Sequence, residues 1–184
     1  SVLRAESVDR SVILDWSQPQ AQTIVTPAMS YLMANVLSDE TARRQSLGSS
    51  NSLEIGRPAG VKVGQTSDGR DAWVVGFTPS YAVATWTGVR GESDAVTPRF
   101  PAVLWNALMQ TASENTTADG WTAPLGVSTM TVCDPSGMLP TRECPNLVTE
   151  VFLNGSEPTQ ADTMFREFSV NRETGLLATV FTPP

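Results

Sequence analysis

The chain lacks histidine altogether, holds a single lysine at position 62, and has only two cysteines among its 184 residues. Without histidine it can form no Ser-His-Asp or Cys-His catalytic arrangement, and most kinds of zinc site are excluded. Two cysteines are too few to hold a metal, so we predict neither a metal nor another cofactor. The sequence also lacks a signal segment and any apolar run of about 18 residues, so we expect any membrane anchor to lie outside this chain.

Positive charge is scarce as well. The net charge is −7 and the isoelectric point is about 4.5, which argues against a nucleic-acid partner, because such a partner requires a basic face. Hydrophobic residues make up 40% of the chain and charged residues 17%, as in ordinary globular proteins. The length suffices for one domain with an appendage, or for two small domains.

Three consecutive strands are predicted between residues 60 and 88. Asp68-Gly69 favours a tight two-residue hairpin, and Pro79 suits the second position of a turn over residues 78–81. In the middle strand, bulky residues beginning with Trp73 alternate with small ones beginning with Ala72. Because both faces are apolar, we predict that the strand is covered on both sides and that the meander packs between helices.

Two helices are predicted on either side of the meander. Thr26-Pro27 has the pattern of a capped helix start, and a short polar turn over residues 38–44 follows this helix. The second helix begins at Phe100-Pro101, after a polar loop over residues 90–99. Apolar residues spaced by three or four positions are predicted to face the core, namely Met29, Leu32, Met33, Val36 and Leu37 in the first helix and Leu104, Trp105, Leu108 and Met109 in the second.

The ends of the chain have a different character. Residues 1–24 are predicted to form an edge strand or an irregular lead-in. Cys133 and Cys144 enclose a loop rich in glycine and proline. This pattern is consistent with a disulfide, which would stabilise the fold by about 3 kcal/mol by closing the loop, or with two reduced thiols. Thr174-Gly175 is predicted to turn a hairpin between residues 168–170 and 176–181.

An ordered series of short motifs carries a family resemblance. Residues 62–66 (KVGQT), 70–79 (RDAWVVGFTP) and 86–88 (WTG) resemble the end of a bacterial penicillin-binding transpeptidase, a family whose signature includes Ser-x-x-Lys and Lys-Thr-Gly. Residues 37–59 and the segment 133–159 resemble the class A, bifunctional members in particular. The resemblance implies an α+β fold, with an antiparallel meander flanked by helices and a small β-rich C-terminal extension. We expect residues 1–113 to belong to the transpeptidase domain, 114–124 to form a linker, and 125–184 to form the extension.

The resemblance also implies a function. Members of this family build peptidoglycan outside the cytoplasmic membrane. They transfer an acyl group from D-Ala-D-Ala stem peptides through a serine, and β-lactams acylate that serine; a glycosyltransferase accompanies this activity in the class A proteins. The implied substrate-binding residues are Lys62, Val63, Gly64, Gln65 and Thr66. Lys62 would face the substrate carboxylate, Gly64 would leave room for the substrate, and the backbone N–H of Gln65 would be an oxyanion donor.

Several departures from the family limit this expectation. Ala59 stands three residues before Lys62, so the chain contains no Ser-x-x-Lys, and we expect the isolated chain to be inactive. Val63 and Gln65 replace hydroxyl residues of the family motif, and the loss of one hydrogen bond to a charged group costs about 1.5–3 kcal/mol.

Those replacements leave open an alternative, a non-catalytic binding or scaffolding module derived from a degenerate transpeptidase. Lys62 would then be a solvated charge on a strand edge. In either case, we interpret Arg70 and Asp71 as an ion pair at the base of the hairpin and Trp73 as a core indole.

Overall fold

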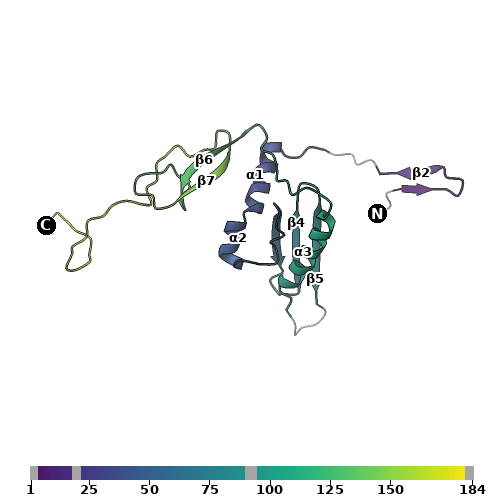
Figure 1. Cartoon of the computed structure of the whole chain (residues 1–184), viewed down its shortest axis with the longest axis horizontal. Helices are drawn as coiled ribbons and strands as arrows, with labels where there is room; N and C mark the ends of the chain where they lie inside the picture. Colours follow the sequence, from purple (N-terminus) through teal and green to yellow (C-terminus); the bar gives the residue numbers. More distant parts are fainter. Residues whose placement is uncertain (1–3, 18–21, 90–94, 181–184) are drawn as a thin grey trace.

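The computed structural model describes residues 4–17, 22–89 and 95–180 and contains three helices and seven strands in these ranges. In chain order these are β1 (Arg4–Glu6), β2 (Val12–Asp15), α1 (Pro27–Ser38), α2 (Glu40–Leu47), β3 (Gly60–Gln65), β4 (Asp71–Phe77), β5 (Ala82–Gly88), α3 (Arg99–Ser113), β6 (Val127–Cys133) and β7 (Leu147–Leu153). The strands form three antiparallel sheets, β1–β2, β3–β4–β5 and β6–β7 (Figure 1). The α+β class with an antiparallel meander is confirmed.

The first hairpin, β1–β2, lies apart from the other elements, as Figure 1 shows at the N-terminal end. The expected edge strand is therefore one half of a separate two-stranded hairpin, in which Arg4 pairs with Asp15 at 3.1 Å. Residues 1–3 and 18–21 of the expected lead-in lie outside the described residues.

The meander has the three predicted strands, but one of its turns differs from the prediction. The β3–β4 connection is a longer loop rather than a two-residue hairpin, because the N–H of Thr66 bonds the carbonyl of Asp71 and the N–H of Gly69 bonds the carbonyl of Thr66. Gly69 has φ +71°, a conformation that glycine adopts without a Cβ clash. The β4–β5 turn is as predicted, with Thr78 bonded to Tyr81 across Pro79 and Ser80.

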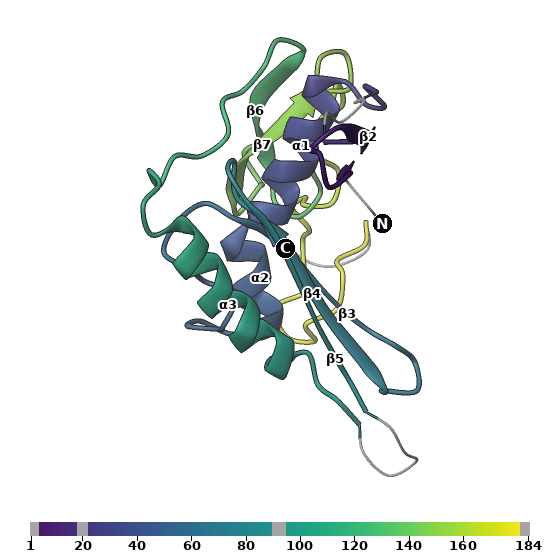
Figure 2. The same cartoon turned by 90° about the vertical axis from the view of Figure 1, so that its right-hand side faces the viewer.

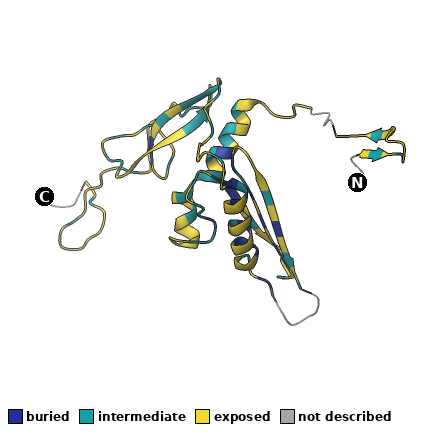
Figure 3. Ribbon diagram, turned by 45° about the vertical axis from the view of Figure 1, so that its right-hand side comes forward, coloured by how far each residue is buried: buried dark blue, intermediate teal, exposed yellow. Residues whose placement is uncertain are grey.

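Only one face of the meander is well covered. Ala72 and Val74 are fully buried, and Gly76 lies under the indole of Trp105 from α3. On the opposite face Trp73 and Val75 are 47% and 48% exposed, so the prediction that the strand is covered on both sides is wrong for these two residues. Figure 3 shows the buried residues concentrated where α3 meets the sheet. Helix α1 lies near Phe77 at one end of this second face, and Trp73 and Val75 lie farther along the strand.

Gly76 provides a direct test of this packing. A Cβ added there would overlap the Trp105 ring and lie 2.9 Å from the carbonyl oxygen of Gly60, and neither group has room to retreat. We expect Gly76→Ala to destabilise the chain by about 1–3 kcal/mol, as overpacking of a core does. Urea unfolding followed by circular dichroism measures the change. Gly64→Ala is the matched control, because a Cβ at Gly64 meets nothing within 4 Å; equal losses for the two variants would contradict the packing described here.

Helix α1 begins as predicted but does not bury its apolar stripe. The Oγ1 of Thr26 accepts the N–H of Met29 and caps the helix, and Pro27 occupies the first turn. Met29, Met33 and Val36 are 42%, 56% and 62% exposed, and Ala34 is the buried residue of this helix. The prediction of core filling is therefore wrong for these three residues, because the described part of the chain leaves about half of their surface uncovered, whereas Leu32 and Leu37 are partly buried.

The other helices also refine the predictions. The polar segment after α1 is a true helix, α2, capped by the Asp39 carboxylate through the N–H of Ala42. In α3, Trp105 and Met109 are fully buried as predicted, whereas Leu104 and Leu108 are about half exposed. From Ala102 onward the buried residues are spaced by three or four positions, and Pro101 precedes them directly: Pro101, Ala102, Trp105, Met109 and Ser113. Residues 90–94 of the predicted polar loop lie outside the described part of the chain.

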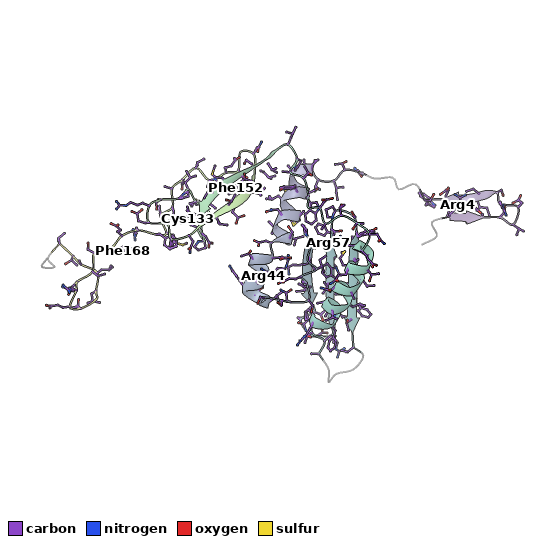
Figure 4. All side chains as sticks on the ribbon, in the orientation of Figure 1. Arg4, Arg44, Arg57, Cys133, Phe152 and Phe168 are labelled. Atoms are coloured by element: carbon purple, nitrogen blue, oxygen red, sulfur yellow. A yellow bond between two sulfur atoms is a disulfide. The ribbon has the colours of Figure 1, made fainter. Side chains whose placement is uncertain are left out.

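The segment between α3 and β6 is fastened to the sheet. The Nη1 of Arg57 donates to the Oγ1 of Thr116 at 3.1 Å, and the ring of Trp121 meets Phe77 edge to face, with 5.5 Å between ring centroids (Figure 4 labels Arg57). Beyond it, β6 and β7 form a hairpin beside α1 (Figure 2). No helix among the described residues is both long and apolar enough to cross a membrane.

The C-terminal part is held by a disulfide and short bridges. Cys133, at the end of β6, is joined to Cys144. The N–H of Asn171 donates to the carbonyl of Leu176, and Val170 pairs with Leu177 in a single antiparallel bridge. The predicted turn at Thr174-Gly175 is therefore present, but the described residues on either side of it form no strands. The last residue of that predicted strand, position 181, lies outside the described residues.

Candidate functional site

Lys62 lies on an edge strand. The order of the sheet is β3–β4–β5, so β3 has β4 on one side and no strand on the other among the described residues. Lys62 is exposed, stands opposite Val75 of β4, and its Nζ donates to the carbonyl of Val63 at 3.1 Å. No acidic side chain among the described residues forms an ion pair with it. Its charge is therefore available to an anion at the outer edge of the strand.

The hydrogen-bond phase of β3 determines which backbone groups reach that edge. The N–H of Thr66 donates to the carbonyl of Asp71 at 3.0 Å. Because the direction of the N–H groups alternates along a strand, those of Gly64 and Lys62 also point toward β4. The N–H groups of Val63 and Gln65 consequently point away from β4. Gln65 is the last residue of the strand, and its N–H faces the open edge that Lys62 borders.

The face that carries Lys62 is open and aromatic. Gly64, Trp73 and Trp86 lie opposite one another across the three strands, and a Cβ at Gly64 would meet nothing within 4 Å. The ring centroids of the two indoles are 6.2 Å apart, and their planes are tilted by 45° to each other. The Nε1 of Trp86 donates to the Oδ1 of Asp71 at 2.8 Å. Lys62 and Gly64 share a face, as their spacing predicts.

Two interpretations from the sequence need correction here. Arg70 does not pair with Asp71 at the base of the hairpin; it lies 3.8 Å from Asp68, while Asp71 accepts the indole N–H of Trp86. Trp73 is not a core indole, because 47% of its surface is exposed. The error about Trp73 comes from treating the second face of the sheet as covered.

Val63 and Gln65 lie on the other face of β3. Val63 stands opposite Val74 and packs against the core cluster, and Gln65 stands opposite Ala72. The Nε2 of Gln65 donates to the carbonyl of Val96 at 2.5 Å, so its side chain extends toward the segment that precedes α3 and away from Lys62. The strict alternation of side chains along a strand could have revealed this difference from the sequence alone.

The turn beside the site is ordered by Thr66 and Asp68. The Thr66 hydroxyl donates to the Oδ1 of Asp68 at 2.7 Å, and this bond, followed by the N–H of Arg70, lowers the pKa of the Asp68 carboxyl. Asp71 in turn donates its N–H to the Thr66 hydroxyl at 3.0 Å. The hydroxyl of Thr66 therefore serves the turn, although the residue follows directly on the candidate edge.

Two cavities in the described part of the chain lie away from this edge. A space of about 390 Å³ lies between Arg142 and Phe165 in the C-terminal part, and one of about 360 Å³ lies between α1, Phe77 and Trp121. Within the described ranges, no three His, Cys, Asp or Glu side chains gather in a way that could hold a metal ion. The candidate site is thus an exposed strand edge rather than an enclosed pocket.

The fold matches a solved penicillin-binding protein. The crystal structure of penicillin-binding protein 1A from Haemophilus influenzae superposes with a TM-score of 0.58 at 20% identity, over 77% of this chain and 22% of that one. This likeness defines the class: the meander with its flanking helices is part of a transpeptidase-like α+β fold.

Sequence comparisons narrow the class to a family. Residues 123–167 match the family model described as the penicillin-binding protein 1A C-terminal domain. Penicillin-binding protein 1A of Clostridium perfringens is 31% identical over 82% of this chain and 19% of its own length. The Mycobacterium tuberculosis protein of the same name is 33% identical over 42% of this chain and 11% of its own length. Together these findings identify the chain as a C-terminal part of a class A penicillin-binding protein. The chain spans about a fifth or less of the length of these relatives.

Proposed function

We propose that this chain supplies one wall of the acyl-transfer site of a peptidoglycan D,D-transpeptidase, and that the serine nucleophile lies on polypeptide outside it. The observation that carries the proposal is the unpartnered edge of β3, where the Lys62 ammonium and the Gln65 N–H lie on the same border of the sheet. A cation and an outward N–H, separated by Val63 and by Gly64, which has open space above it, suit a substrate that lies along the strand.

The chemistry assigns each group a separate task. The serine oxygen attacks the carbonyl of a D-Ala-D-Ala bond, and the carbonyl oxygen gains negative charge as the tetrahedral intermediate forms. The N–H of Gln65 would donate to that oxygen, a role that does not depend on its side chain. The ammonium of Lys62 would hold the terminal carboxylate of the stem peptide, or that of a β-lactam. When the intermediate collapses, the amide C–N bond breaks, D-alanine leaves, and an amine later takes the acyl group from the serine.

The exposed apolar surface supports a site completed by further polypeptide. Trp73, Val75 and Trp86 on the sheet and Met33 and Val36 on α1 are all about half exposed. Contiguous apolar patches on a protein surface usually mark a surface that something else covers. We propose that the missing half of the transpeptidase domain, including the serine-bearing helix, covers these residues.

The remaining assignments follow from the same proposal. The longer protein would act on peptidoglycan at the extracytoplasmic face of the bacterial membrane, anchored by a segment outside this chain, with a glycosyltransferase elsewhere in the polypeptide. Residues 1–113 would belong to the transpeptidase domain, 114–124 to the linker and 125–184 to the extension. Stem peptides and β-lactams would be its ligands.

Labelling with a fluorescent penicillin tests the proposal. The longer polypeptide is expected to form a covalent adduct, because it contains both the serine and the edge that holds the β-lactam carboxylate. The isolated 184-residue chain is expected to show no mass increase after the same incubation, because it contains no Ser-x-x-Lys. An adduct on a serine of the isolated chain would contradict the proposed division of the site.

One specific observation favours a second candidate, a binding or scaffolding module without catalysis. Neither Val63 nor Gln65 offers a hydroxyl to a substrate carboxylate, and both side chains are engaged on the helix-covered side of β3. Such a module would keep the meander and bind its partner without acylation. Failure of the longer polypeptide to react with the fluorescent penicillin, while it still binds peptidoglycan, would establish this second function.

A further inference from the structure

The end of β3, at Gln65, is held by side-chain contacts in addition to its backbone bonds to β4. Gln65 is the last residue of the strand, and on the side of β4 the next backbone bond is the one from the Thr66 N–H to Asp71. A terminal residue of an edge strand tends to fray, because it has a neighbouring strand on one side only. The orientation of the Gln65 peptide therefore depends on its bonds to β4 and on whatever else anchors the residue on the open side.

The side chain of Gln65 provides such an anchor. Its Nε2 donates to the carbonyl of Val96, and the N–H of Val96 donates to the carbonyl of Gly69 at 2.8 Å. Val96 is only 4% exposed. Ala95 lies close to Gly69, since a Cβ added at Gly69 would be only 3.1 Å from the Cβ of Ala95. The two hydrogen bonds and this contact join the end of β3, the β3–β4 turn and the segment before α3 into one unit, which we call the Gln65 clip.

We infer that Gln65 is a positioning residue, whose side chain fixes the outward backbone N–H of the same residue through the Gln65 clip. This inference rests on the proposed function, because a fixed N–H matters for catalysis only if it donates to a developing oxyanion. Donors of this kind accelerate a reaction because they are oriented before the charge appears. A threonine, which the family carries at this position, is too short to reach the Val96 carbonyl from the same backbone. The glutamine thus lacks the hydroxyl of the family's threonine, but its longer side chain holds the end of β3 more rigidly.

The experiment compares Gln65→Ala with Ser67→Ala, a control on the same exposed turn. On the 184-residue chain, hydrogen exchange of the Val96 and Gly69 amides reports on the clip. In the longer polypeptide, stopped-flow measurements with a penicillin separate non-covalent binding from the acylation step. For Gln65→Ala we expect faster exchange at both amides and an acylation step slowed by roughly three- to tenfold, as for the loss of one neutral hydrogen bond. Non-covalent binding should be unchanged, and Ser67→Ala should alter neither measurement.

The outcomes separate this inference from the function on which it rests. Faster exchange together with slower acylation and unchanged binding supports it. Faster exchange with an unchanged acylation step, in a protein that still reacts with penicillin, overturns the positioning role and leaves the proposed function intact. Unchanged exchange at both amides overturns the clip itself. A longer polypeptide that never reacts, with or without the substitution, overturns both the inference and the proposed function.

Discussion

Replacing Trp105 by alanine is expected to lower the free energy of unfolding by about 3–5 kcal/mol, the range found when a buried large aromatic residue is truncated. Trp105 is fully buried, belongs to the core cluster with Val61, Val74 and Met109, and its ring fills the space above Gly76. The loss is a large fraction of the stability of an ordinary small domain.

Thermal and urea unfolding followed by far-ultraviolet circular dichroism measure this effect without relying on tryptophan fluorescence. Leu104→Ala is the matched control, because Leu104 precedes Trp105 in the same helix and is 50% exposed. We expect its cost to be well under half that of Trp105→Ala. A larger loss for Leu104 would mean that α3 presents a different side to the sheet.

Replacing Lys62 by alanine in the longer polypeptide is expected to slow acylation by a penicillin by about 30-fold to several thousandfold. The range corresponds to roughly 2–5 kcal/mol, the cost of truncating one partner of a desolvated charge pair. Lys62 is the chain's single lysine, and β3 (Gly60–Gln65) contains no arginine. No other side chain of the strand could take over the carboxylate.

The second-order rate constant of acylation measures the effect, with Arg70→Ala as the control. Arg70 is an exposed cation on the adjoining turn that pairs with Asp68 at 3.8 Å, and exposed pairs contribute little. We expect Arg70→Ala to change the rate by less than about threefold. Equal losses for the two variants would show that general positive charge, rather than the position of Lys62, attracts the substrate.

The local chemistry of the sequence was sufficient to predict α1, α3 and the three strands of the meander, whereas α2 was predicted only as a polar turn. Thr26-Pro27 specifies a helix start because the hydroxyl and the proline ring act within one turn, and Thr78–Tyr81 specifies a hairpin for similar reasons. Lys62 on an edge strand followed from the ordered motifs of residues 62–88. These features depend on neighbours in the chain, which the sequence contains in full.

Burial was predicted less well, because it depends on what lies opposite a face. Met29, Met33 and Val36 on α1 and Trp73 and Val75 on β4 have the periodicity of core positions, yet they remain about half exposed. Periodicity indicates that a face is apolar but does not supply the element that covers it. The side-chain bond from Gln65 to Val96 was also beyond prediction, because it joins residues that are 31 positions apart in the chain.

A structure of the longer polypeptide acylated by a β-lactam tests the central claim most directly. We predict that the carbonyl oxygen of the acyl-serine lies about 2.7–3.1 Å from the backbone nitrogen of Gln65, with the ligand carboxylate beside the Nζ of Lys62. A serine that reaches the ligand from another side, with the Gln65 N–H bonded to an additional strand of the sheet, would contradict the claim that this edge is one wall of the site.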